Sequence, residues 1–289
     1  MSQRVVIFGS GGQLGVELMR EFQKRGYETT GFERTGVDIT DRGRVEQVIA
    51  EHDPAVIVNS AAYNQVDVAE QEPQGAYAAN ALAVRNLALA ARQVDARLVH
   101  FSTDYVFDGR AGRPYTEADR PHPTGAYAVS KYAGELYAEA YLDDPLIIRT
   151  SGVFGPAGVT TNRGNFVELM LRLAASSNPI RVVEDHVASP TFAPALAGRT
   201  VDLVVKKASG VFHIGGGTPI SWYDFAAMIF KLAGLTPQLR ATNEREYRTP
   251  AQRPKYSALA NSRLEEAGVA AMPPLEEALR EYMRQTGRI

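Results

Sequence analysis

The chain begins with a short apolar run that ends at a glycine turn and passes directly into an amphipathic segment. Residues 4–8 are rich in β-branched side chains, as strands are. Leu14, Leu18 and Phe22 then recur at spacings of four within Gln13 to Lys24, which is typical of a helix. We therefore expect strand, tight turn and helix, the arrangement from which parallel sheets are built.

The same alternation continues through the first half of the chain. Further strands are expected at residues 28–32, 55–59, 97–102 and 146–150, and helices between them at 41–51, 76–93 and 127–141. The strands are apolar on both faces, which is typical of a parallel sheet covered by helices on each side. The sequence predicts an α/β fold, a Rossmann-type doubly wound parallel sheet.

Beyond Thr150 the pattern becomes irregular. Gly, Pro and Thr are frequent from Gly152 to Gly164, and short elements continue to a final helix over 275–285. The 289 residues suit one large domain with a smaller appendage. We predict a sheet domain over 1–152 that also takes in parts of 188–218. Most of 153–289 is expected to form a smaller mixed α/β lobe.

Composition limits the class of protein. Acidic residues number 33 and basic residues 31, and the formal net charge of −2 argues against nucleic acid or a membrane surface as partner. The chain has no cysteine, so disulfides, Cys-ligated metals and thiol catalysis are excluded. No apolar run approaches the roughly 18 residues of a membrane span, and the first is too short for a signal peptide. We expect a cytoplasmic protein.

The glycine turn has the spacing of a dinucleotide-binding loop. Three glycines recur every third residue, so the backbone can adopt positive φ and approach a pyrophosphate at the helix N-terminus. A P-loop is excluded because no Lys-Ser or Lys-Thr follows the last glycine. The residues of the turn expected to bind the cofactor are Gly9, Ser10, Gly12, Gln13, Leu14 and Gly15.

The end of the second strand carries residues that choose between NAD and NADP. Glu33 would accept bonds from the free ribose hydroxyls of NAD, whereas Arg34 would pair with the 2′-phosphate of NADP. Both are present, so the preference between NADPH and NADH stays open, and both could also be solvated charges. Asp38 and Ile39 could edge the adenine, although Asp38-x-Thr-Asp41 also fits an ordinary helix N-cap.

Tyr127 and Lys131 form the pattern Tyr-x-x-x-Lys at the start of a predicted helix. Residues four apart share one helix face, so the ammonium can lie near the phenol and favour its ionised form. A tyrosine so placed can act as a general acid or base. Ser102 and Thr103 end the fourth predicted strand, where such sheets bind ligands, and either could bond a substrate oxygen beside Tyr127.

Taken together, these motifs resemble those of the extended short-chain dehydrogenase/reductases. The matching segments are Gly9-x-x-Gly12-x-x-Gly15, Asn-Ser-Ala-Ala-Tyr at 59–63, Ser-Thr-Asp-Tyr-Val-Phe-Asp-Gly at 102–109 and Tyr127-x-x-x-Lys131. Within that group the chain most resembles the dTDP-4-dehydrorhamnose reductases, through further matches at 66–73, 182–191, 210–213 and 253–259. The resemblance covers essentially the whole chain.

The resemblance implies an oxidoreductase that uses NAD(P)H to reduce the C4 keto group of a dTDP-linked 6-deoxyhexose, in particular dTDP-4-dehydro-L-rhamnose in dTDP-rhamnose biosynthesis. It implies that Tyr127 protonates the C4 oxyanion, Lys131 holds the nicotinamide ribose, and Thr103 bonds the C4 oxygen. Further cofactor contacts would come from Ala61, Ala62, Tyr63 and Asn80. Substrate contacts would come from Val66, Asp104, Tyr105, Phe107 and Arg253.

Two positions distinguish this interpretation from related enzymes. Sugar-nucleotide dehydratases carry a glutamate where this chain has Tyr105, and without that carboxylate no route to eliminate water is evident. Gly152 stands where the bacterial rhamnose enzymes typically have a tryptophan near the sugar, and a longer loop from Pro156 to Arg163 follows. A 4-ketoreductase for another dTDP-deoxysugar therefore remains an alternative.

The resemblance also bears on metals and assembly. Some members of the family dimerise through magnesium held by glutamates; Glu17 matches one of these, but Pro194 stands where another carboxylate would be expected. We therefore predict no metal site, and a monomer or homodimer. A non-catalytic dinucleotide-binding subunit, like the regulatory subunit of methionine adenosyltransferase, is the alternative from another class. Thr103, Tyr127 and Lys131 argue against it because all three are intact.

Overall fold

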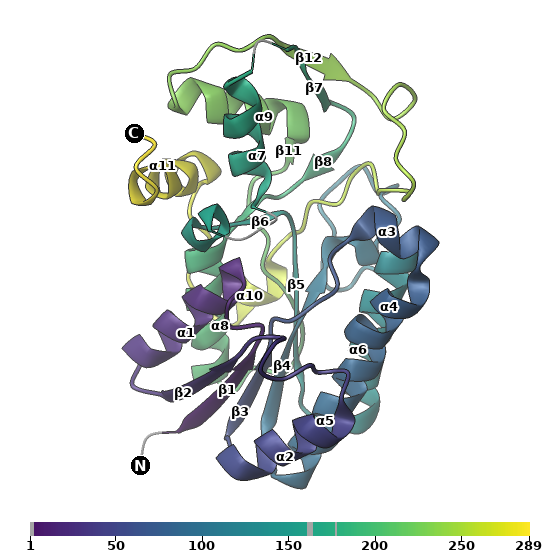
Figure 1. The fold of residues 1–289 in the computed structure, drawn as a ribbon, viewed down its shortest axis with the longest axis vertical. Coiled ribbons are helices and arrows are strands. Elements are labelled where there is room, and N and C mark those ends of the chain that lie inside the picture. The colour runs from purple at the N-terminus through teal and green to yellow at the C-terminus, as the bar shows by residue number, and fades with distance from the viewer. Residues whose placement is uncertain (1–2, 161–163, 177) are drawn as a thin grey trace.

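A parallel sheet organises the larger lobe of the chain, whose computed structural model describes residues 3–160, 164–176 and 178–289. Within those ranges six strands pair in parallel, in the order β10-β5-β4-β3-β1-β2. Their bounds are Arg4–Phe8 (β1), Glu28–Phe32 (β2), Val56–Asn59 (β3), Arg97–Thr103 (β4), Leu146–Thr150 (β5) and Gly210–His213 (β10). Figure 1 shows the smaller lobe above the sheet, beyond the carboxyl ends of its strands.

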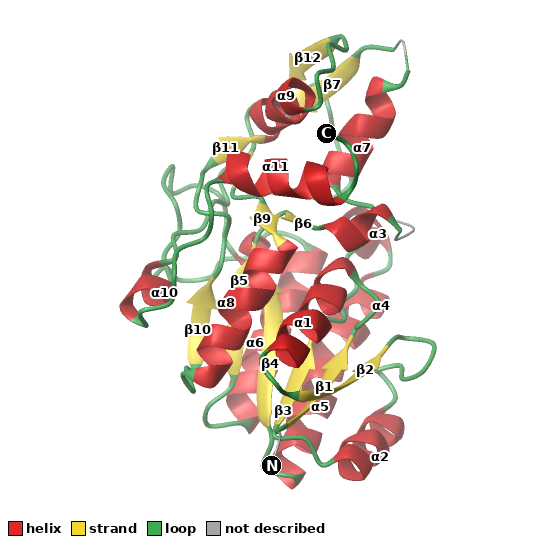
Figure 2. Cartoon of the chain, turned by 90° about the vertical axis from the view of Figure 1, so that its left-hand side faces the viewer, coloured by secondary structure: helices red, strands yellow, loops and turns green. Residues whose placement is uncertain are grey.

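Helices cover both faces of this sheet, because alternate residues of each strand point to opposite sides. The covering helices are α1 (Gln13–Lys24), α2 (Arg42–His52), α5 (Ala83–Gln93), α6 (Ala126–Tyr141) and α8 (Ala193–Val205). Val5 and Ile7 of β1 pack with α1 and α8, whereas Val6 and Phe8 pack with α2, α5 and α6. The layers are visible in Figure 2. The predicted doubly wound α/β fold is confirmed.

The helix expected over 76–93 is not a single α-helix. It divides into α4 (Pro73–Tyr77), a π-helical turn η1 (Ala78–Leu82) and α5. The extra residue of a π turn lets Asn80 reach out of the regular hydrogen-bond ladder. Its amide bonds the backbone of Tyr63 and the hydroxyl of Ser130, so the irregularity fixes a loop and a neighbouring helix.

The smaller lobe is built from short elements around an aromatic core. Phe154, Phe225 and Tyr282 lie in this core and are fully buried. Its elements are β6 (Val153–Phe154), η3 (Pro156–Val159), α7 (Phe166–Ala174), β7 (Ile180–Val183), β8 (Val187–Ala188), β9 (Thr191–Phe192), β11 (Ile220–Ser221), α9 (Trp222–Leu232), β12 (Leu239–Thr242) and α11 (Leu275–Gln285). Residues 161–163 of the predicted longer loop lie outside the described residues.

The second half of the chain contributes to both lobes. Helix α8 packs against α1, and β10 extends the sheet beside β5. The short helix α10 (Ser262–Glu266) also returns to the larger lobe, where Leu264 joins the core under the sheet. Two further short elements, α3 (Val66–Gln71) and η2 (Asp104–Val106), follow β3 and β4 at the edge that faces the smaller lobe. Among the described helices none is long and apolar enough to cross a membrane.

A buried ion pair connects α6 to the sheet. Arg149 of β5 donates to Glu135 of α6, with Nη2 to Oε2 at 2.6 Å and Nε to Oε1 at 3.0 Å. Both side chains are at most 4% exposed. The hydroxyl of Ser102, on β4, also donates to Glu135. The guanidinium lies 5.3 Å from the ring centroid of Phe107. Two strands and one helix are therefore fixed relative to each other by one carboxylate.

Replacing Glu135 with alanine should lower the free energy of unfolding by about 3–5 kcal/mol, because Arg149 would remain buried without its partner. Urea unfolding followed by circular dichroism measures the loss. The matched control is Glu276→Ala, which removes the exposed partner of Arg280 and should leave the midpoint nearly unchanged. Equal midpoints for both variants would contradict a structural role for the buried pair.

Candidate active site

The glycine turn after β1 brings the start of α1 close to the edge of the sheet. Gly9 has a φ of +80°, which favours glycine, and its N–H donates to the carbonyl of Phe32 at 2.8 Å. A Cβ on Gly9 would lie 2.6 Å from the backbone nitrogen of Ala61, and one on Gly15 would lie 2.1 Å from Gly9 O. A side chain at either glycine would therefore force the turn away from its neighbours. Ser10, within the turn, also donates its N–H to Phe32 O, at 3.2 Å.

The N-terminus of α1 forms one wall of a cavity of about 350 Å³. The N-cap is Gly12, which has no side chain to satisfy the first N–H groups of the helix. Gly12, Gln13, Leu14 and Gly15 all line the cavity. Backbone donors and the positive end of the helix dipole make such a wall a favourable place for a phosphate.

Four residues expected at the adenosine end lie outside this cavity. The side chain of Glu33 lies over Gly11, where a Cβ would be 2.6 Å from its Oε1. Arg34 is 87% exposed and bonds Asp38 at 3.2 Å. Ile39 is buried in the core beside α2 and α5.

Asp38 and Asp41 both accept hydrogen bonds from the backbone in the segment that leads into α2. Asp38 accepts from the N–H and hydroxyl of Thr40, at 2.9 and 2.8 Å, and the backbone bond holds the pKa of Asp38 below its ordinary value. Asp41 is the N-cap of α2 and accepts from the N–H of Arg44 at 3.0 Å. The N-cap alternative therefore describes the local structure of this segment.

The segment after β3 is held from behind by Asn80. The carbonyl of its amide accepts from Tyr63 N at 2.8 Å, while its NH₂ donates to Tyr63 O and to Ser130 Oγ at 3.0 Å. Ala62 lines the cavity, and Ala61 packs beneath the glycine turn. Asn80 is itself buried behind the loop, so it positions the cavity wall instead of forming it.

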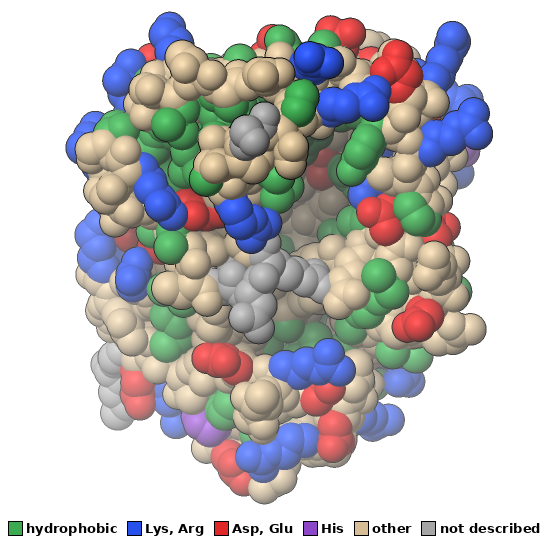
Figure 3. All heavy atoms as spheres, turned by 45° about the horizontal axis from the view of Figure 1, so that its top comes forward, with side chains coloured by type: hydrophobic (Ala, Val, Ile, Leu, Met, Phe, Trp, Pro, Cys, Tyr) green, Lys and Arg blue, Asp and Glu red, His purple; other side chains and the backbone are tan. Residues whose placement is uncertain are grey.

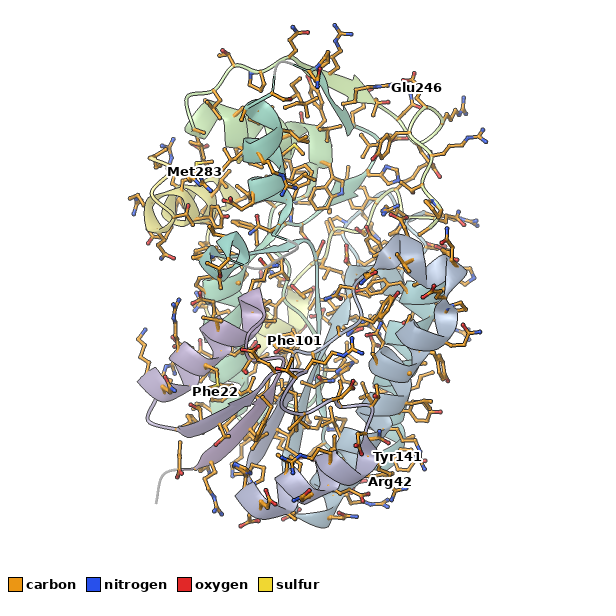
Figure 4. The ribbon with its side chains drawn as sticks, in the orientation of Figure 1. Phe22, Arg42, Phe101, Tyr141, Glu246 and Met283 are labelled. Atoms are coloured by element: carbon orange, nitrogen blue, oxygen red, sulfur yellow. The ribbon has the colours of Figure 1, made fainter. Side chains whose placement is uncertain are left out.

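Tyr127 and Lys131 lie one turn apart on the buried face of α6 and line the same cavity as the glycine turn. Thr103, the last residue of β4, lines it too. Lys131 Nζ donates to Phe101 O at 2.5 Å, and the Tyr127 hydroxyl donates to Asn64 Oδ1 at 3.4 Å. Figure 4 labels Phe101 near the centre of the molecule, at the end of the sheet below the smaller lobe. The fold thus brings the three predicted catalytic residues together beside the turn.

Burial dominates the electrostatics of this cluster. It raises the pKa of Tyr127 well above its ordinary value, although the neighbouring Thr103 hydroxyl opposes the rise. Burial lowers the pKa of Lys131 to about 8, against the negative charge of Glu135, which raises it. Burial therefore opposes the expected ionisation of the phenol, and the ammonium donates to a backbone carbonyl. A phenol that keeps its proton is suited to act as an acid.

Asp104 is a buried carboxylate at the floor of the same cavity. It accepts hydrogen bonds from the hydroxyls of Thr103 at 3.1 Å, Ser151 at 2.8 Å and Ser257 at 2.5 Å. Burial raises the pKa of Asp104 to about 6, although these hydroxyls oppose the rise. Thr103 also accepts from the N–H of Tyr105, so its hydroxyl is held from two directions.

Two residues that the sequence suggested as substrate contacts have other partners. The hydroxyl of Ser102 donates to Glu135 within the buried ion-pair network, which leaves Thr103 as the hydroxyl beside Tyr127. Phe107, an expected substrate contact, is fully buried and stacks on Tyr115 with ring centroids 4.2 Å apart. It does not line this cavity, nor does it line a second, larger cavity next to it. Its position is that of a core residue.

A larger cavity of about 810 Å³ adjoins the first. Tyr105 lines it, and the Tyr105 ring lies 6.1 Å from that of Tyr127 in the smaller cavity. Val66, at the start of α3, packs with Tyr105 and Tyr127 in one apolar cluster. Phe166 and Trp222 form an aromatic wall on the side of the smaller lobe. Figure 3 shows this face hollowed between the two lobes.

The opposite wall of the larger cavity is basic. Its cationic residues are Arg181, Arg245, Arg248, Arg253 and Lys255, against the acidic residues Asp67 and Glu244. Arg253 donates to Asp67 at 2.8 Å and also bonds the Tyr105 hydroxyl, whose pKa burial raises to about 12. Within the described ranges, Arg245 and Arg248 form no ion pair. An excess of guanidinium groups suits a diphosphate.

Several lining residues were not expected from the sequence. Ser60 and Asn64 line the smaller cavity. Their place in the sequence could have indicated this, since they adjoin the cofactor contacts expected at 61–63. Val153 and Trp222 come from a part of the chain without clear periodicity. No local pattern marks these two, because only the packing of the two lobes brings them to the cavities.

The described residues contain no group of three or more His, Asp or Glu side chains placed to hold a metal ion. Glu17 accepts from Arg20 at 2.9 Å on α1. Pro194 lies in the first turn of α8, where the missing N–H of proline is tolerated.

Comparison with known proteins decides the family. The family model described as RmlD substrate binding domain matches residues 3–288. The chain belongs to this family. The resemblance expected from the sequence motifs is therefore confirmed.

Relatives of this RmlD-family chain match it along almost its whole length. It is 38% identical over 288 residues to dTDP-4-dehydrorhamnose reductase from Streptomyces griseus, covering 96% of this chain and 92% of the relative. It is 36% identical over 271 residues to dTDP-4-keto-6-deoxy-D-glucose reductase from Streptomyces niveus, covering 93% and 92%. The crystal structure of dTDP-4-dehydrorhamnose reductase from Bacillus anthracis in complex with NADP superposes with a TM-score of 0.94 at 36% identity, covering 99% and 100%.

The raised pKa of Asp104 predicts a pH dependence of stability. Its folded pKa of about 6 exceeds the ordinary value of 3.8, so the proton stabilises the folded state. That stabilisation is complete below pH 3.8 and is lost as the pH rises through 6. Relative to the non-titrating Asp104→Asn variant, the wild type should lose on the order of 3 kcal/mol of unfolding free energy over this window. Urea unfolding of both proteins across the window measures it, and a pH-independent difference would contradict the shift.

Proposed function

We propose that this chain is an NADPH-dependent oxidoreductase that reduces the C4 keto group of dTDP-4-dehydro-L-rhamnose to give dTDP-L-rhamnose. The observation that carries the proposal is that Thr103, Tyr127 and Lys131 line one cavity with the N-terminus of α1. Membership of the RmlD family and relatives named dTDP-4-dehydrorhamnose reductase support it.

The residues of the smaller cavity fit a dinucleotide. Gly9 and Gly15 leave no space for a side chain, so only their backbone lies between the turn and its neighbours. The α1 N-terminus would hold the pyrophosphate, and Lys131 and Tyr127 would bind the nicotinamide ribose. Arg34, exposed beside the turn, is available for a 2′-phosphate, which favours NADPH over NADH.

The chemistry requires a hydride and a proton. The hydride for the C4 carbonyl carbon would come from a bound reduced nicotinamide, and the π electrons of the carbonyl would move to its oxygen. Tyr127 donates its phenolic proton to that oxygen, giving the C4 hydroxyl and a phenolate. Lys131, one helical turn away on the same face, stabilises the phenolate as it forms. The hydroxyl of Thr103 turns from Asp104 to bond the C4 oxygen.

The larger cavity would hold the nucleotide half of the substrate. Its basic wall would bind the diphosphate, and Phe166 on α7 would contact the apolar parts of the nucleotide. Tyr105 and Arg253, which bond each other where the two cavities adjoin, would lie beside the sugar. The substrate would then extend from the smaller lobe to Tyr127.

A second candidate is a 4-ketoreductase for another dTDP-deoxysugar. Gly152 favours it, because this position lines the catalytic cavity without a side chain. The relative named dTDP-4-keto-6-deoxy-D-glucose reductase belongs to the same range of identity. NMR of the product separates the two by the configuration at the reduced carbon. A heteromeric complex that oxidises no NADPH with any sugar nucleotide would instead favour the regulatory alternative.

We further propose that the enzyme works in the cytoplasm as a monomer or homodimer, without a nucleic-acid or membrane partner. The near-neutral net charge supports this, as does a chain without cysteine, which suits a reducing compartment.

Replacing Tyr127 with phenylalanine should lower kcat by roughly 10²–10⁴-fold, since only the proton donor is removed. The affinity for NADPH should fall by less than about tenfold, because the variant loses only one of the hydrogen bonds to the nicotinamide ribose and Lys131 is kept. Loss of NADPH absorbance with dTDP-4-dehydro-L-rhamnose measures turnover, and a fluorescence titration measures NADPH affinity. Near-normal turnover in the variant would refute the assignment of Tyr127.

Replacing Gly9 with alanine should weaken NADPH binding by about tenfold or more, equivalent to 1.4 kcal/mol. The added methyl group would meet Ala61 N at 2.6 Å and displace the turn. Gly26→Ala is the matched control: Gly26 has a φ of +82°, but its Cβ position has no atom within 4 Å. It carries backbone strain alone and should bind NADPH normally. Equal weakening in both variants would trace the loss to strain instead of close approach.

A further inference from the structure

The position of Trp222 suggests a role that core packing does not account for. Trp222 is the first residue of α9 and the only tryptophan of the chain. Its inner face packs on Phe166 and Phe225, with ring centroids 4.7 and 6.2 Å away. The side chain is only partly buried, whereas Phe225 is completely buried. The indole therefore covers the core of the smaller lobe and presents its other parts to a cavity.

The outer edge of the indole lies close to Gly152, at the wall of the smaller cavity. A Cβ placed on Gly152 would lie 3.0 Å from Cη2 and 3.7 Å from Cζ2 of Trp222. Gly152 lines the smaller cavity with Thr103 and Tyr127, whereas Trp222 lines the larger one. The indole thus lies where the two cavities meet.

The missing side chain at Gly152 leaves room for the indole of Trp222. Gly152 has a φ of +48°, in the left-handed region that favours glycine. A side chain here would push the indole edge back by a few tenths of an ångström, whereas Pro190 Cα, 3.4 Å from the same Cβ position, would be at ordinary contact distance. The absence of a side chain at 152 therefore leaves a place that the indole edge occupies from another element.

The indole N–H is also available. Across residues 3–160, 164–176 and 178–289 it donates no hydrogen bond, so it is free to donate one to a ligand. An indole with an open N–H and an exposed apolar face can contact the apolar face of a sugar ring and donate to one of its oxygens.

We propose that the Trp222 indole is the surface on which the sugar ring of the substrate lies, and that it determines specificity for the 6-deoxyhexose. This rests on the proposed function and deepens it. The sugar lies between the indole on α9 and the pair Thr103 and Tyr127 on the other side of the junction. Its C5-methyl face meets the indole, and the C4 oxygen faces Tyr127. The smaller lobe therefore recognises the sugar as well as the nucleotide.

The single tryptophan makes a direct binding test possible. Emission of wild-type Trp222 is measured during titration with dTDP-L-rhamnose and, separately, with dTDP, both in the presence of NADP⁺. We expect a saturable change with dTDP-L-rhamnose that is at least about twofold larger than that with dTDP. Equal changes with the two ligands would place the indole against the nucleotide and overturn the proposal. This test needs no variant and so does not depend on any variant folding.

Affinity of variants gives the second test. Trp222→Ala should raise the Kd of dTDP-L-rhamnose at least about tenfold and leave the Kd of dTDP and NADPH within about twofold. Trp222→Phe should recover part of the loss, since it restores an aromatic face. Calorimetric titration measures all three ligands, and thermal unfolding monitors the fold. A fall in melting temperature with an unchanged ratio of the two dTDP affinities would show a purely structural role and refute the proposal.

Coupling between the two positions is tested with a double-mutant cycle. Gly152→Ala should displace the indole and weaken dTDP-L-rhamnose binding, and its effect should be smaller when Trp222 is already alanine. Strain at φ of +48° is present in both arms and cancels. Additive effects would contradict the pairing. If the wild type neither binds dTDP-L-rhamnose nor oxidises NADPH, the proposed function fails; if it does both while Trp222→Ala binds normally, only the present inference fails.

Discussion

The buried carboxylate of Glu135 determines where the reactive side chains of α6 stand. It binds Arg149 of β5 and the hydroxyl of Ser102 on β4, all within the core. Lys131 lies one helical turn before Glu135, and Tyr127 one turn before that. Because side chains four apart share a face, fixing Glu135 against two strands also fixes the phenol and the ammonium against the end of the sheet.

The same burial sets the protonation states around the cavity. Removing water disfavours every charged form, so the pKa values of Tyr127 and Asp104 rise and that of Lys131 falls. Hydroxyl donors and the nearby Glu135 carboxylate reduce these shifts without reversing them. A phenol held in its neutral form beside an ammonium is arranged to give up a proton when negative charge develops on a substrate oxygen.

The two cavities divide recognition from chemistry. The smaller one lies at the carboxyl ends of the strands, where loops of an open α/β sheet meet ligands. The larger one is lined by aromatic and basic residues that come mostly from the smaller lobe. Tyr105 and Trp222 lie where they meet, so a ligand that spans both cavities contacts elements far apart in the sequence.

Local patterns determined most of the sheet lobe. Strand and helix bounds there follow from apolar periodicity. The glycine turn and Tyr-x-x-x-Lys identified residues that line the smaller cavity. Both kinds of pattern are visible in the sequence because each depends on only a few neighbouring residues. Only the tertiary structure decided the π turn at Asn80, the core position of Phe107, the direction of the Tyr127 pKa and the meeting of Gly152 with Trp222. Each of these depends on which distant segment of the chain packs against the residue. Apolar periodicity reflects local structure and does not encode such contacts.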